Sequence, residues 1–550
     1  MSPRKKRRKK PQRREVKLDT LKSILERAKS EPLSDEDIEQ LTAAVDTLAH
    51  LTQALEAEGA TVARLRKMLF GSQSEKTKDV VGTESADKGA GTDERPRRGD
   101  KRGDKPPKKR KGHGRNGAAS YTGAEKVTQP HQSLEHGDLC PSCDKGKVYR
   151  QAEPAVLVRV TGVAPLSATV YELERLRCNL CGEVFTAQAP PGVGSKKYDE
   201  TAAAMIALLK YGCGLPFNRI QRLGNDLGVP MPAATQWEVV EKAAKAVEQP
   251  WVELVHQAAQ GDVVHIDDTN AKVLDLNAEL QEQIAAGKGD RTGVFTSGIV
   301  STTNGRQIAL FFTGRNHAGE NIADVLARRT ADLDAPILMC DALSRNTSTD
   351  FSAIVANCLA HGRRHFVDVV DRFPDEVRHV LEVLADVYKI DAKTRSLSDE
   401  QRLLLHQEHS KPLMDDLEKW LGQLLDERKV EPNSTLGGAI TYMQNHWDKL
   451  TLFLRQPGAP LDNNAVERSL KRAILHRKNS LFYKTENGAH VGDVFMTLIH
   501  TAELSGVNPF DYLVALQRHH KTVAQAPHEW VPWSYQDALA RLKAVSNPKH

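Results

Sequence analysis

Three short runs rich in apolar and β-branched residues follow one another in the middle of the chain. They are Val263–Ile266, Gly293–Ser301 and Gln307–Phe312. Each run has the length of a strand, and the turn residues Thr302–Gly305 separate the second run from the third. The pattern therefore predicts three strands, consecutive in sequence, that can form a meander.

Further strand and helix patterns follow these three runs. A helical pattern covers Glu320–Arg329, a fourth strand is expected over Pro336–Cys340 and a second helix over Asp350–Ala360. Asp267 follows the first strand directly, and Asp341 follows the fourth. An order βββαβα with acids at these two strand ends is the plan of a ribonuclease-H-like nucleotidyl-transfer domain. We therefore expect a multidomain α/β protein.

Helical periodicity dominates on both sides of this region. Before it, Ala202–Tyr211, Asn218–Leu227 and Thr235–Val247 form three helical patterns with tight turns, similar to a helix-turn-helix. The alternative is a helical connector, because the last pattern offers few Arg or Asn side chains for base edges. After it, residues 375–447 are helix-rich and poor in glycine, which predicts an all-helical insertion into the catalytic domain.

A seven-residue repeat of apolar positions lies near the N-terminus. Residues 34–37 supply cap-forming and acidic side chains before it, and Gly71 follows it. The repeat predicts a short coiled coil that joins copies of the chain into a homodimer or a larger assembly. With only four heptads, the alternative is a helix that packs inside its own chain. The repeating residues are Leu41, Leu48, Leu55, Val62 and Leu69.

Two Cys-x-x-Cys pairs predict a structural zinc site. Each pair forms a tight turn whose two thiolates can reach one tetrahedral Zn²⁺ ion, and strands are expected over residues 155–160 and 169–173 between the pairs. The segment therefore has the pattern of a zinc ribbon, and the alternative is four ordinary buried thiols. The remaining cysteines, Cys213, Cys340 and Cys358, are expected in the core. The zinc ligands would be Cys140, Cys143, Cys178 and Cys181.

Charge is distributed unevenly along the 550 residues. The whole chain has a formal net charge of +5, but residues 1–130 alone carry 31 Lys and Arg against 20 Asp and Glu, or +11. The basic stretches Arg4–Arg14 and Arg95–Arg115 cannot bury a core, and they suit flexible arms that bind nucleic acid phosphates. The alternative is a role in solubility or targeting. No apolar run approaches the roughly 20 residues of a membrane span, and no signal peptide is evident, so we expect an intracellular protein.

Three carboxylates form the candidate catalytic site. Acids at the ends of adjacent strands can converge on one point and bind hard divalent cations, here two Mg²⁺ ions with Mn²⁺ able to substitute. Glu467 is the third acid, on a helix that Asp462 or Asn463 can cap. Spacing does not separate Asp267 from Asp268, although we prefer Asp267. The catalytic and Mg²⁺-binding residues are thus expected to be Asp267, Asp341 and Glu467.

Basic residues near these acids suit the backbone of a bound DNA strand. One group lies on the same helix as Glu467 or just beyond it, and the other lies in the cluster 361–365. Cys358 and His361 form a Cys-x-x-His pattern, which we interpret as support near the active site. The candidate DNA-binding residues are Arg468, Lys471, Arg472, Arg477, Lys478, Arg363 and Arg364.

Ordered motifs over nearly the whole chain resemble the DDE transposases of the bacterial insertion-sequence-sixty-six family. The resemblance implies that Asp267, Asp341 and Glu467 are the catalytic triad, that the helical insertion is a family feature and that two small accessory proteins are partners. The family commonly has Asp-Glu-Thr where this chain has Asp267-Asp268-Thr269, which leaves the role of Asp268 open. The matching segments are Leu69–Lys76, Gly112–Arg115, the two cysteine pairs, His265–Thr269, Ala360–Phe366, Asn463–Arg468, Arg477–Phe482 and Gly506–Leu513.

The expected function is transposition of an insertion sequence in the bacterial cytoplasm, in association with the nucleoid. The chain would cleave element ends and join their 3′-hydroxyls to target DNA. The alternatives are a non-catalytic DNA-binding regulator and a ribonuclease-H-like nuclease that only hydrolyses. The expected division is a basic arm (1–33), a coiled coil (34–71), a basic linker (72–130), a zinc ribbon (131–190), a helix-turn-helix-like segment (196–248), a catalytic domain in two parts (260–370 and 457–515) around a helical insertion (371–456), and a C-terminal tail (516–550).

Overall fold

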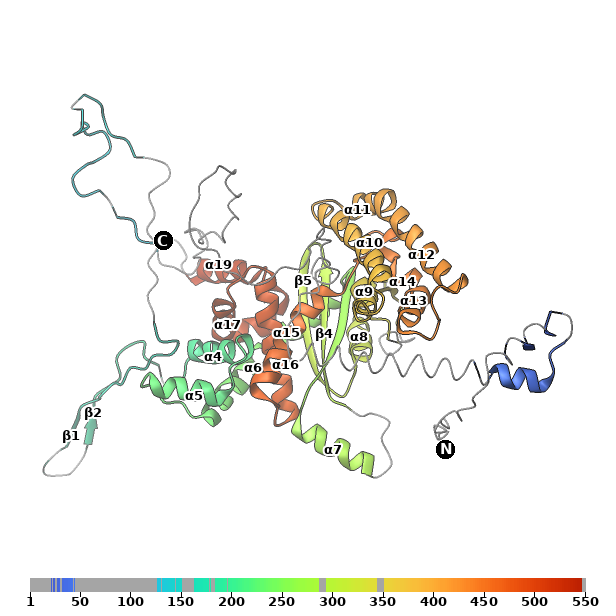
Figure 1. Cartoon of the computed structure of the whole chain (residues 1–550). Helices are drawn as coiled ribbons and strands as arrows, with labels where there is room; N and C mark the ends of the chain where they lie inside the picture. The colour runs from blue at the N-terminus through green and yellow to red at the C-terminus, as the bar shows by residue number, and fades with distance from the viewer. Residues whose placement is uncertain are drawn as a thin grey trace, which may run out of the picture. The chain divides into compact units, whose positions relative to one another are not determined.

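A computed structural model describes short stretches between residues 21 and 44 and most of residues 126–546 (Figure 1). The gaps after residue 126 are 130, 144, 151–162, 178, 180–183, 195, 286–292 and 344–350. Contacts divide the chain into two compact units, one of residues 1–84 with 168–550 and the other of residues 85–167. Among the described residues, no helix is both long and apolar enough to cross a bilayer. Most of the predicted coiled coil and both basic arms lie outside the described residues.

A five-stranded mixed sheet forms the centre of the larger unit. Its order is β5-β4-β3-β6-β7, with antiparallel pairing on the β4 and β5 side and parallel pairing on the β6 and β7 side. Asn304 and Gly305 both have positive φ and form the two-residue turn between β4 and β5, so the predicted meander is confirmed. The strands are β3 (Val263–Asn270), β4 (Phe295–Thr303), β5 (Arg306–Gly314), β6 (Ile337–Cys340) and β7 (Ile354–Asn357).

The prediction of a helix over Asp350–Ala360 was wrong. Residues 354–357 form the strand β7, which pairs with β6, and the helix α9 begins only at Leu359 and ends at Val367. The run Ile354-Val355-Ala356 is too short for its periodicity to separate a strand from a helix, and pairing with β6 decides in favour of the strand. The basic cluster 361–365 therefore lies inside α9 and not after a helix.

Helix α16 (Glu486–Leu504) covers the outer edge of β5. Its side chains at positions 493, 497 and 501 accept hydrogen bonds from the backbone N–H groups of Thr313, Phe311 and Ala309, at 2.6, 3.2 and 3.2 Å. Four residues of a helix advance by about 6 Å and two residues of a strand by about 6.7 Å. Every fourth residue of α16 therefore lies beside every second residue of β5. The edge strand is therefore paired with side chains and not left open.

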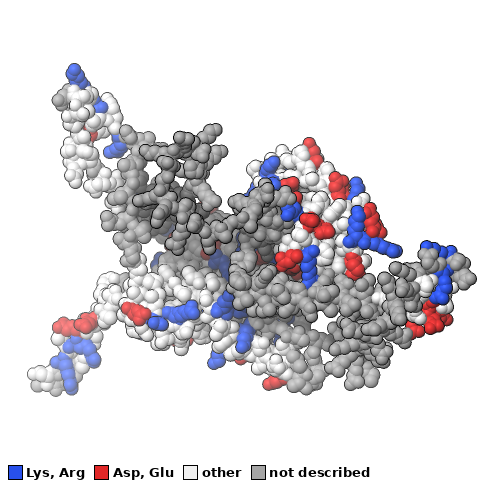
Figure 2. All heavy atoms as spheres, viewed as in Figure 1, with Lys and Arg blue, Asp and Glu red and all other residues white. Residues whose placement is uncertain are grey.

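A separate helical module follows α9, as the helical pattern predicts. Buried side chains of its helices form one hydrophobic core with side chains of β6 and β7 such as Met339 and Ala356. On the visible face of α10 to α12, acidic and basic side chains are interspersed (Figure 2). The module comprises α10 (Pro374–Lys393), α11 (Asp399–Leu405) with the turn η4 (His406–Ser410), α12 (Lys411–Asp426), α13 (Thr435–Asn445), α14 (Trp447–Leu450) and η5 (Leu452–Leu454).

The three helices expected before the sheet are present, but the third is longer than predicted. Helix α6 runs through Pro250 to Ala259, where its last carbonyl groups accept hydrogen bonds from Ser301 and Arg329. It packs on the sheet, on α16 and on the C-terminal helices, as expected for a connector. The three helices are α4 (Glu200–Ala207) with its extension η2 (Leu208–Gly212), α5 (Phe217–Asp226) and α6 (Ala233–Ala259).

The C-terminal segment that the sequence division treats as a tail is largely helical. Its elements between residues 509 and 530 pack on α6, residues 535–546 pack on these elements, and Trp530 is 1% exposed. The Tyr512 hydroxyl donates to the backbone oxygen of Trp530 at 2.9 Å. The elements here are α17 (Pro509–Arg518), α18 (His520–Gln525), η6 (Pro527–Trp530) and α19 (Tyr535–Ser546).

Short strands are present in the cysteine-containing region, but not at the predicted positions. Residues 169–173 form no strand, whereas β1 (Arg175–Arg177) pairs antiparallel with β2 (Val184–Thr186) on either side of the second cysteine pair. The alternation of apolar and polar residues continues past residue 173 as far as residue 177. Hydrogen bonding to β2 makes only residues 175–177 of this stretch a strand. The other expected strand, 155–160, lies outside the described residues.

Candidate active site

Asp267 and Asp341 occupy matching positions on neighbouring parallel strands. The register pairs Val263 with Ile337 and His265 with Met339, so Asp267 aligns with Asp341, directly after the last residue of β6. Side chains at matching positions of adjacent strands point to the same face of a sheet. Strand pairing thus brings two acids together that are 74 residues apart in the sequence.

The charges of three acids meet at Asp267. Burial, followed by the negative charges of Asp341 and Glu467, raises the pKa of Asp267 to about 7. A hydrogen bond of 2.8 Å from the Asp268 backbone N–H opposes the rise. A buried carboxyl group among other carboxylates binds either a proton or a cation readily, because each relieves the repulsion.

Glu467 reaches this point through the start of helix α15 (Asn464–Ser480). The fully buried Asn463 precedes the helix, and its side-chain amide donates to the backbone oxygen of Ile266 at 2.8 Å. Its Oδ1 atom lies 3.2 Å from His265 Nδ1. Because burial lowers the pKa of His265 to about 4, the neutral ring donates this bond from Nδ1. These bonds hold the first turn of α15 beside Asp267.

A glycine in the sheet lets α15 approach closely. Gly298 is paired with Asp267 across β3 and β4. A Cβ atom at Gly298 would lie 2.8 Å from Leu470 Cγ and 3.1 Å from Val466 Cγ2, both on α15. The absence of a side chain at this position therefore sets the distance between the sheet and Glu467.

Asp268 has a different environment from Asp267. One of its oxygens accepts the Ser297 hydroxyl at 2.7 Å, and the other lies 3.1 Å from both His317 Nδ1 and the backbone nitrogen of Ala318. His317 and Ala318 begin helix α8 (Ala318–Leu326), so Asp268 joins β3 to the start of that helix. Successive strand residues point to opposite faces, which explains why two neighbouring acids differ so much.

The candidate DNA-binding residues divide into two groups. On α15, Arg468, Lys471 and Lys478 are exposed. Arg472 instead forms an ion pair with Glu503, and Arg477 donates to Thr269 and Asn270 at the end of β3. On α9, Arg364 is exposed and Arg363 is half-buried. The exposed basic residues of α15 follow Glu467 along one stripe of the helix, whereas Arg472 and Arg477 connect α15 to its neighbours.

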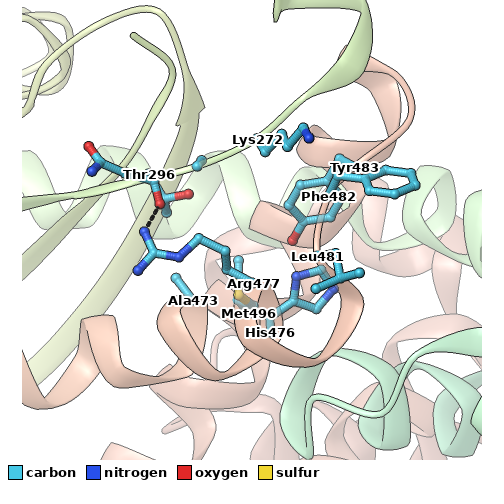
Figure 3. Close-up of a pocket in the computed structure, with 11 residues that line it drawn as sticks. Lys272, Thr296, Ala473, His476, Arg477, Leu481, Phe482, Tyr483 and Met496 are labelled. Carbon is cyan, nitrogen blue, oxygen red and sulfur yellow. Dashed lines mark hydrogen bonds between the residues drawn. The ribbon is translucent and has the colours of Figure 1, made fainter.

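A pocket of about 310 Å³, including its open mouth, lies at the end of β3 (Figure 3). Arg477 and Lys272 line it, together with the ring of Phe482, which is 44% exposed. Leu481 has a φ of +69°, a strained value for this residue type, and it ends α15. The pocket begins three residues beyond Asp267 on β3 and is lined by none of the three acids.

Cys358, His361 and Glu467 form a second group of candidate ligands. One ligand atom from each side chain lies within 4.8 Å of the others. Cys358 is 1% exposed, and burial raises its thiol pKa to about 11. The prediction that Cys358 and Cys340 are core residues is confirmed, but Cys213 is exposed.

Only one cysteine pair of the predicted zinc ribbon lies within the described residues. The Cys140 backbone carbonyl accepts from Cys143 N at 3.3 Å, and Gly146 N donates to Cys143 Sγ at 3.5 Å. Backbone N–H groups of Lys145 and Gly146 lower the pKa of the Cys143 thiol. This turn favours a thiolate at Cys143. Cys178 and Cys181 lie outside the described residues.

Sequence reasoning did not identify three features of this site. The sequence predicts Asn463 as a possible helix cap and His265 and Gly298 as strand residues, and His265 and Asn463 also lie in family motifs, but no pattern predicts their contacts. Their contacts join segments separated by more than 160 residues, so local periodicity contains no signal for them. Asp462 and Asn463, directly before the helix, are the local sign of a structured entry to α15.

Comparison with known proteins identifies similar chains. The model of the family described as "Transposase IS66 family" matches residues 196–491, more than half of the chain. Two uncharacterized proteins of Sinorhizobium fredii, y4jD and y4hP, are 36% identical over 197 residues and 32% identical over 199 residues. These alignments cover 35% and 34% of this chain, and 38% and 36% of the relatives. A third, y4qI, is 24% identical over 367 residues, which is 62% of this chain and 63% of that protein. The chain thus spans less than two thirds of the length of each of these curated relatives.

Proposed function

The chain belongs to the IS66 transposase family, and from this premise we propose that it cleaves the DNA ends of an insertion sequence and joins them to target DNA. Asp267, Asp341 and Glu467 are the proposed catalytic residues. The observation that carries this assignment is that Asp267 is buried close to Asp341 and Glu467: burial, followed by the negative charges of these two acids, raises the pKa of Asp267 to about 7. A merely structural acid would be expected to have the hydrogen-bonded environment of Asp268 instead.

The three side chains fit divalent cations such as Mg²⁺ and Mn²⁺. Their donor atoms are carboxylate oxygens, which these ions prefer, and their mutual repulsion is relieved when positive charge is bound. Two bound ions would activate the attacking oxygen and stabilise the leaving oxygen during displacement at phosphorus. Asp267 and Asp341 would hold them from the sheet, and Glu467 from α15.

The other residues of the site would position the acids and the DNA. Asn463 holds the start of α15 against β3, so that Glu467 stays in place. The exposed stripe of Arg468, Lys471 and Lys478 is proposed to bind phosphates of the DNA strand that crosses the site. Arg363 and Arg364 on α9 are also proposed to bind phosphates of this strand.

The remaining domain assignments complete the proposal. The sheet order, with β3 between an antiparallel pair and a parallel pair, supports a ribonuclease-H-like catalytic domain with α10 to α14 as its insertion. The four-cysteine zinc site, the coiled-coil dimer, the basic arms, the two accessory proteins and the association with the nucleoid remain proposals that rest on the sequence. The basic arms would hold the ends of the element, and the coiled coil would bring two copies of the chain together.

A strand-joining assay tests the proposal. The full chain is incubated with Mg²⁺ and labelled DNA that carries the sequences flanking its own gene, beside Asp341→Ala and a matched control, Asp262→Asn. Asp262 is an exposed acid at the opposite end of the same sheet. The expected result is joined product from the intact chain and from the control, and none from Asp341→Ala.

The other outcomes distinguish the alternatives. Cut ends without joined product, lost in Asp341→Ala, would indicate a hydrolytic nuclease. DNA binding without cutting by any of the proteins, also after addition of the neighbouring gene products, would indicate a regulator and overturn the proposal.

A further inference from the structure

Two helix starts meet beside Glu467. Cys358 immediately precedes α9, and its sulfur accepts the backbone N–H of Asn463 at 3.2 Å. The next residue, Leu359, donates its backbone N–H to Leu461 at 3.0 Å. These two bonds hold the first turn of α9 against the entry to α15. His361, three residues after Cys358, therefore lies on the same side of α9 as Cys358 and close to Glu467.

The side chains at this junction are arranged as ligands. One ligand atom of each of Cys358, His361 and Glu467 lies within 4.8 Å of the other two. The His361 Nδ1 atom is buried and has no hydrogen-bond partner in the described part of the chain. A buried polar atom without a partner is costly, so its presence calls for an explanation, and a bound cation supplies one.

The chemistry of this group differs from that of the three carboxylates. Thiolate and imidazole ligands select zinc-like transition metal ions, whereas Mg²⁺ takes oxygen ligands almost exclusively. A set of one sulfur, one nitrogen and one oxygen donor is one that tetrahedral Zn²⁺ accepts, with its fourth position left for a ligand from outside the chain.

We propose that Cys358, His361 and Glu467 form a site for a zinc-like ion that shares Glu467 with the carboxylate triad. Binding of the ion displaces the proton of the Cys358 thiol, which passes to the buffer. Because the carboxylate of Glu467 then faces Cys358 and His361, it is withdrawn from Asp267 and Asp341. A zinc-like ion bound at this site therefore inhibits strand joining. This inhibition rests on the proposed function, whereas metal binding at the site does not.

The neighbouring strand provides a matched control. Cys340 at the end of β6 is as fully buried as Cys358, and both are free thiols. Cys340, however, belongs to no group of three candidate ligands among the described residues. If burial alone made a cysteine bind metal, the two would behave alike.

Cobalt titration of the full-length chain tests the site, because Co²⁺ replaces Zn²⁺ and a thiolate bound to it gives a charge-transfer absorption band. The number of Co²⁺ ions bound per chain is measured for the intact protein, Cys358→Ser, Glu467→Gln and the control Cys340→Ser. Cobalt that binds to the cysteine pairs near residues 140 and 180 contributes equally in all four proteins, so it does not affect the differences between them. We expect one ion fewer in Cys358→Ser, at least tenfold weaker binding of that ion in Glu467→Gln, and no change in Cys340→Ser.

Equal stoichiometry and equal spectra for the intact chain and Cys358→Ser would overturn the site. Circular dichroism shows whether Cys358→Ser is folded; if it is not, Glu467→Gln alone decides, since this change preserves shape and removes only charge. The switch is tested separately as the ratio of strand joining with and without Zn²⁺, measured for the intact chain and for His361→Ala. Inhibition of at least tenfold in the intact chain that is absent in His361→Ala supports it, and equal inhibition overturns it. A chain that binds the ion but joins no DNA would leave the site intact and refute the proposed function instead.

Discussion

At the scale of single residues, two neighbouring acids with the same chemistry have opposite environments. Asp268 accepts three hydrogen bonds from the β4 and α8 side, whereas Asp267 is buried near two other acids. The first arrangement satisfies a negative charge and stabilises the fold. The second leaves a negative charge unsatisfied, and a stable protein retains such an arrangement at functional sites more often than elsewhere.

The substitution Asp267→Asn is expected to stabilise the chain when divalent cations are removed. The pKa of Asp267 is raised in the folded state, so the folded chain binds more protons than the unfolded chain between about pH 4 and 7, and stability falls as the pH rises through this window. Asn removes this loss. We expect a gain of about 1–2 kcal/mol at pH 8 and a gain less than half as large at pH 5, measured by thermal unfolding in a chelator.

Asp268→Asn serves as the matched variant. It weakens the bonds to Ser297, His317 and Ala318, so it should destabilise the chain by about 1–3 kcal/mol at both pH values. A less stable Asp267→Asn at pH 8, or equal effects of the two variants, would contradict the assignment of their roles.

At the scale of elements, the site depends on how closely α15 and α16 approach the sheet. The approach of α15 depends on Gly298, and α16 is bonded through Asp493, Thr497 and Thr501 to the edge of β5. Both helices come after the helical module in the sequence, yet they complete the layers around the strands that precede it.

Gly298→Ala should displace α15 by a few tenths of an ångström or more. The new methyl group would meet Leu470 and Val466, the residue before Glu467. We expect a stability loss of about 1–3 kcal/mol and a drop in strand joining of about tenfold or more, because small misplacements of catalytic groups slow reactions steeply. Gly314→Ala is the control, since nothing lies within 4 Å of a Cβ atom there. Equal activity of the two variants would show that the close approach is not needed.

Thr497→Val should weaken the edge of the sheet. The variant keeps the shape of the side chain but removes the hydroxyl that accepts the Phe311 N–H, leaving a buried donor without a partner. Chemical denaturation should show a loss of about 1–3 kcal/mol. Thr497→Ser, which retains the hydroxyl, should lose less; a larger loss in the serine variant would mean that packing of the methyl group matters more than the hydrogen bond.

At the scale of the whole molecule, α6 connects regions that are far apart in sequence. It packs on the sheet and on α18 and η6 near the C-terminus, and also on α4, α5 and α16, which lie beside it in Figure 1. Charge is divided differently: the net positive charge lies within residues 1–130, mostly outside the described residues, whereas the remaining chain is acidic overall.

Neutralising the first basic stretch should weaken DNA binding in a salt-dependent way. Replacement of the nine Lys and Arg residues in Arg4–Arg14 by Gln removes phosphate contacts, each of which contributes a slope of about 0.9 to the plot of log affinity against log salt. Filter binding at several salt concentrations should therefore show lower affinity and a shallower slope, with unchanged thermal stability. Replacing nine of the ten Lys and Arg residues between residues 374 and 450 by Gln is the control. An identical effect of that variant would mean that the loss of affinity reflects the total charge of the chain and not the N-terminal arm.

Local sequence determined much of this protein. The strands β3 to β6, the turn at Asn304-Gly305 and most helices could be predicted, because strand and helix periodicity and turn residues act over a few residues. Tertiary structure decided the rest. Pairing with β6 made residues 354–357 a strand, and the pairing register separated Asp267 from Asp268. Cys358 and Glu467, more than 100 residues apart, meet only because two helix starts are bonded to each other. Such contacts depend on which surfaces pack together, and no local pattern contains that information.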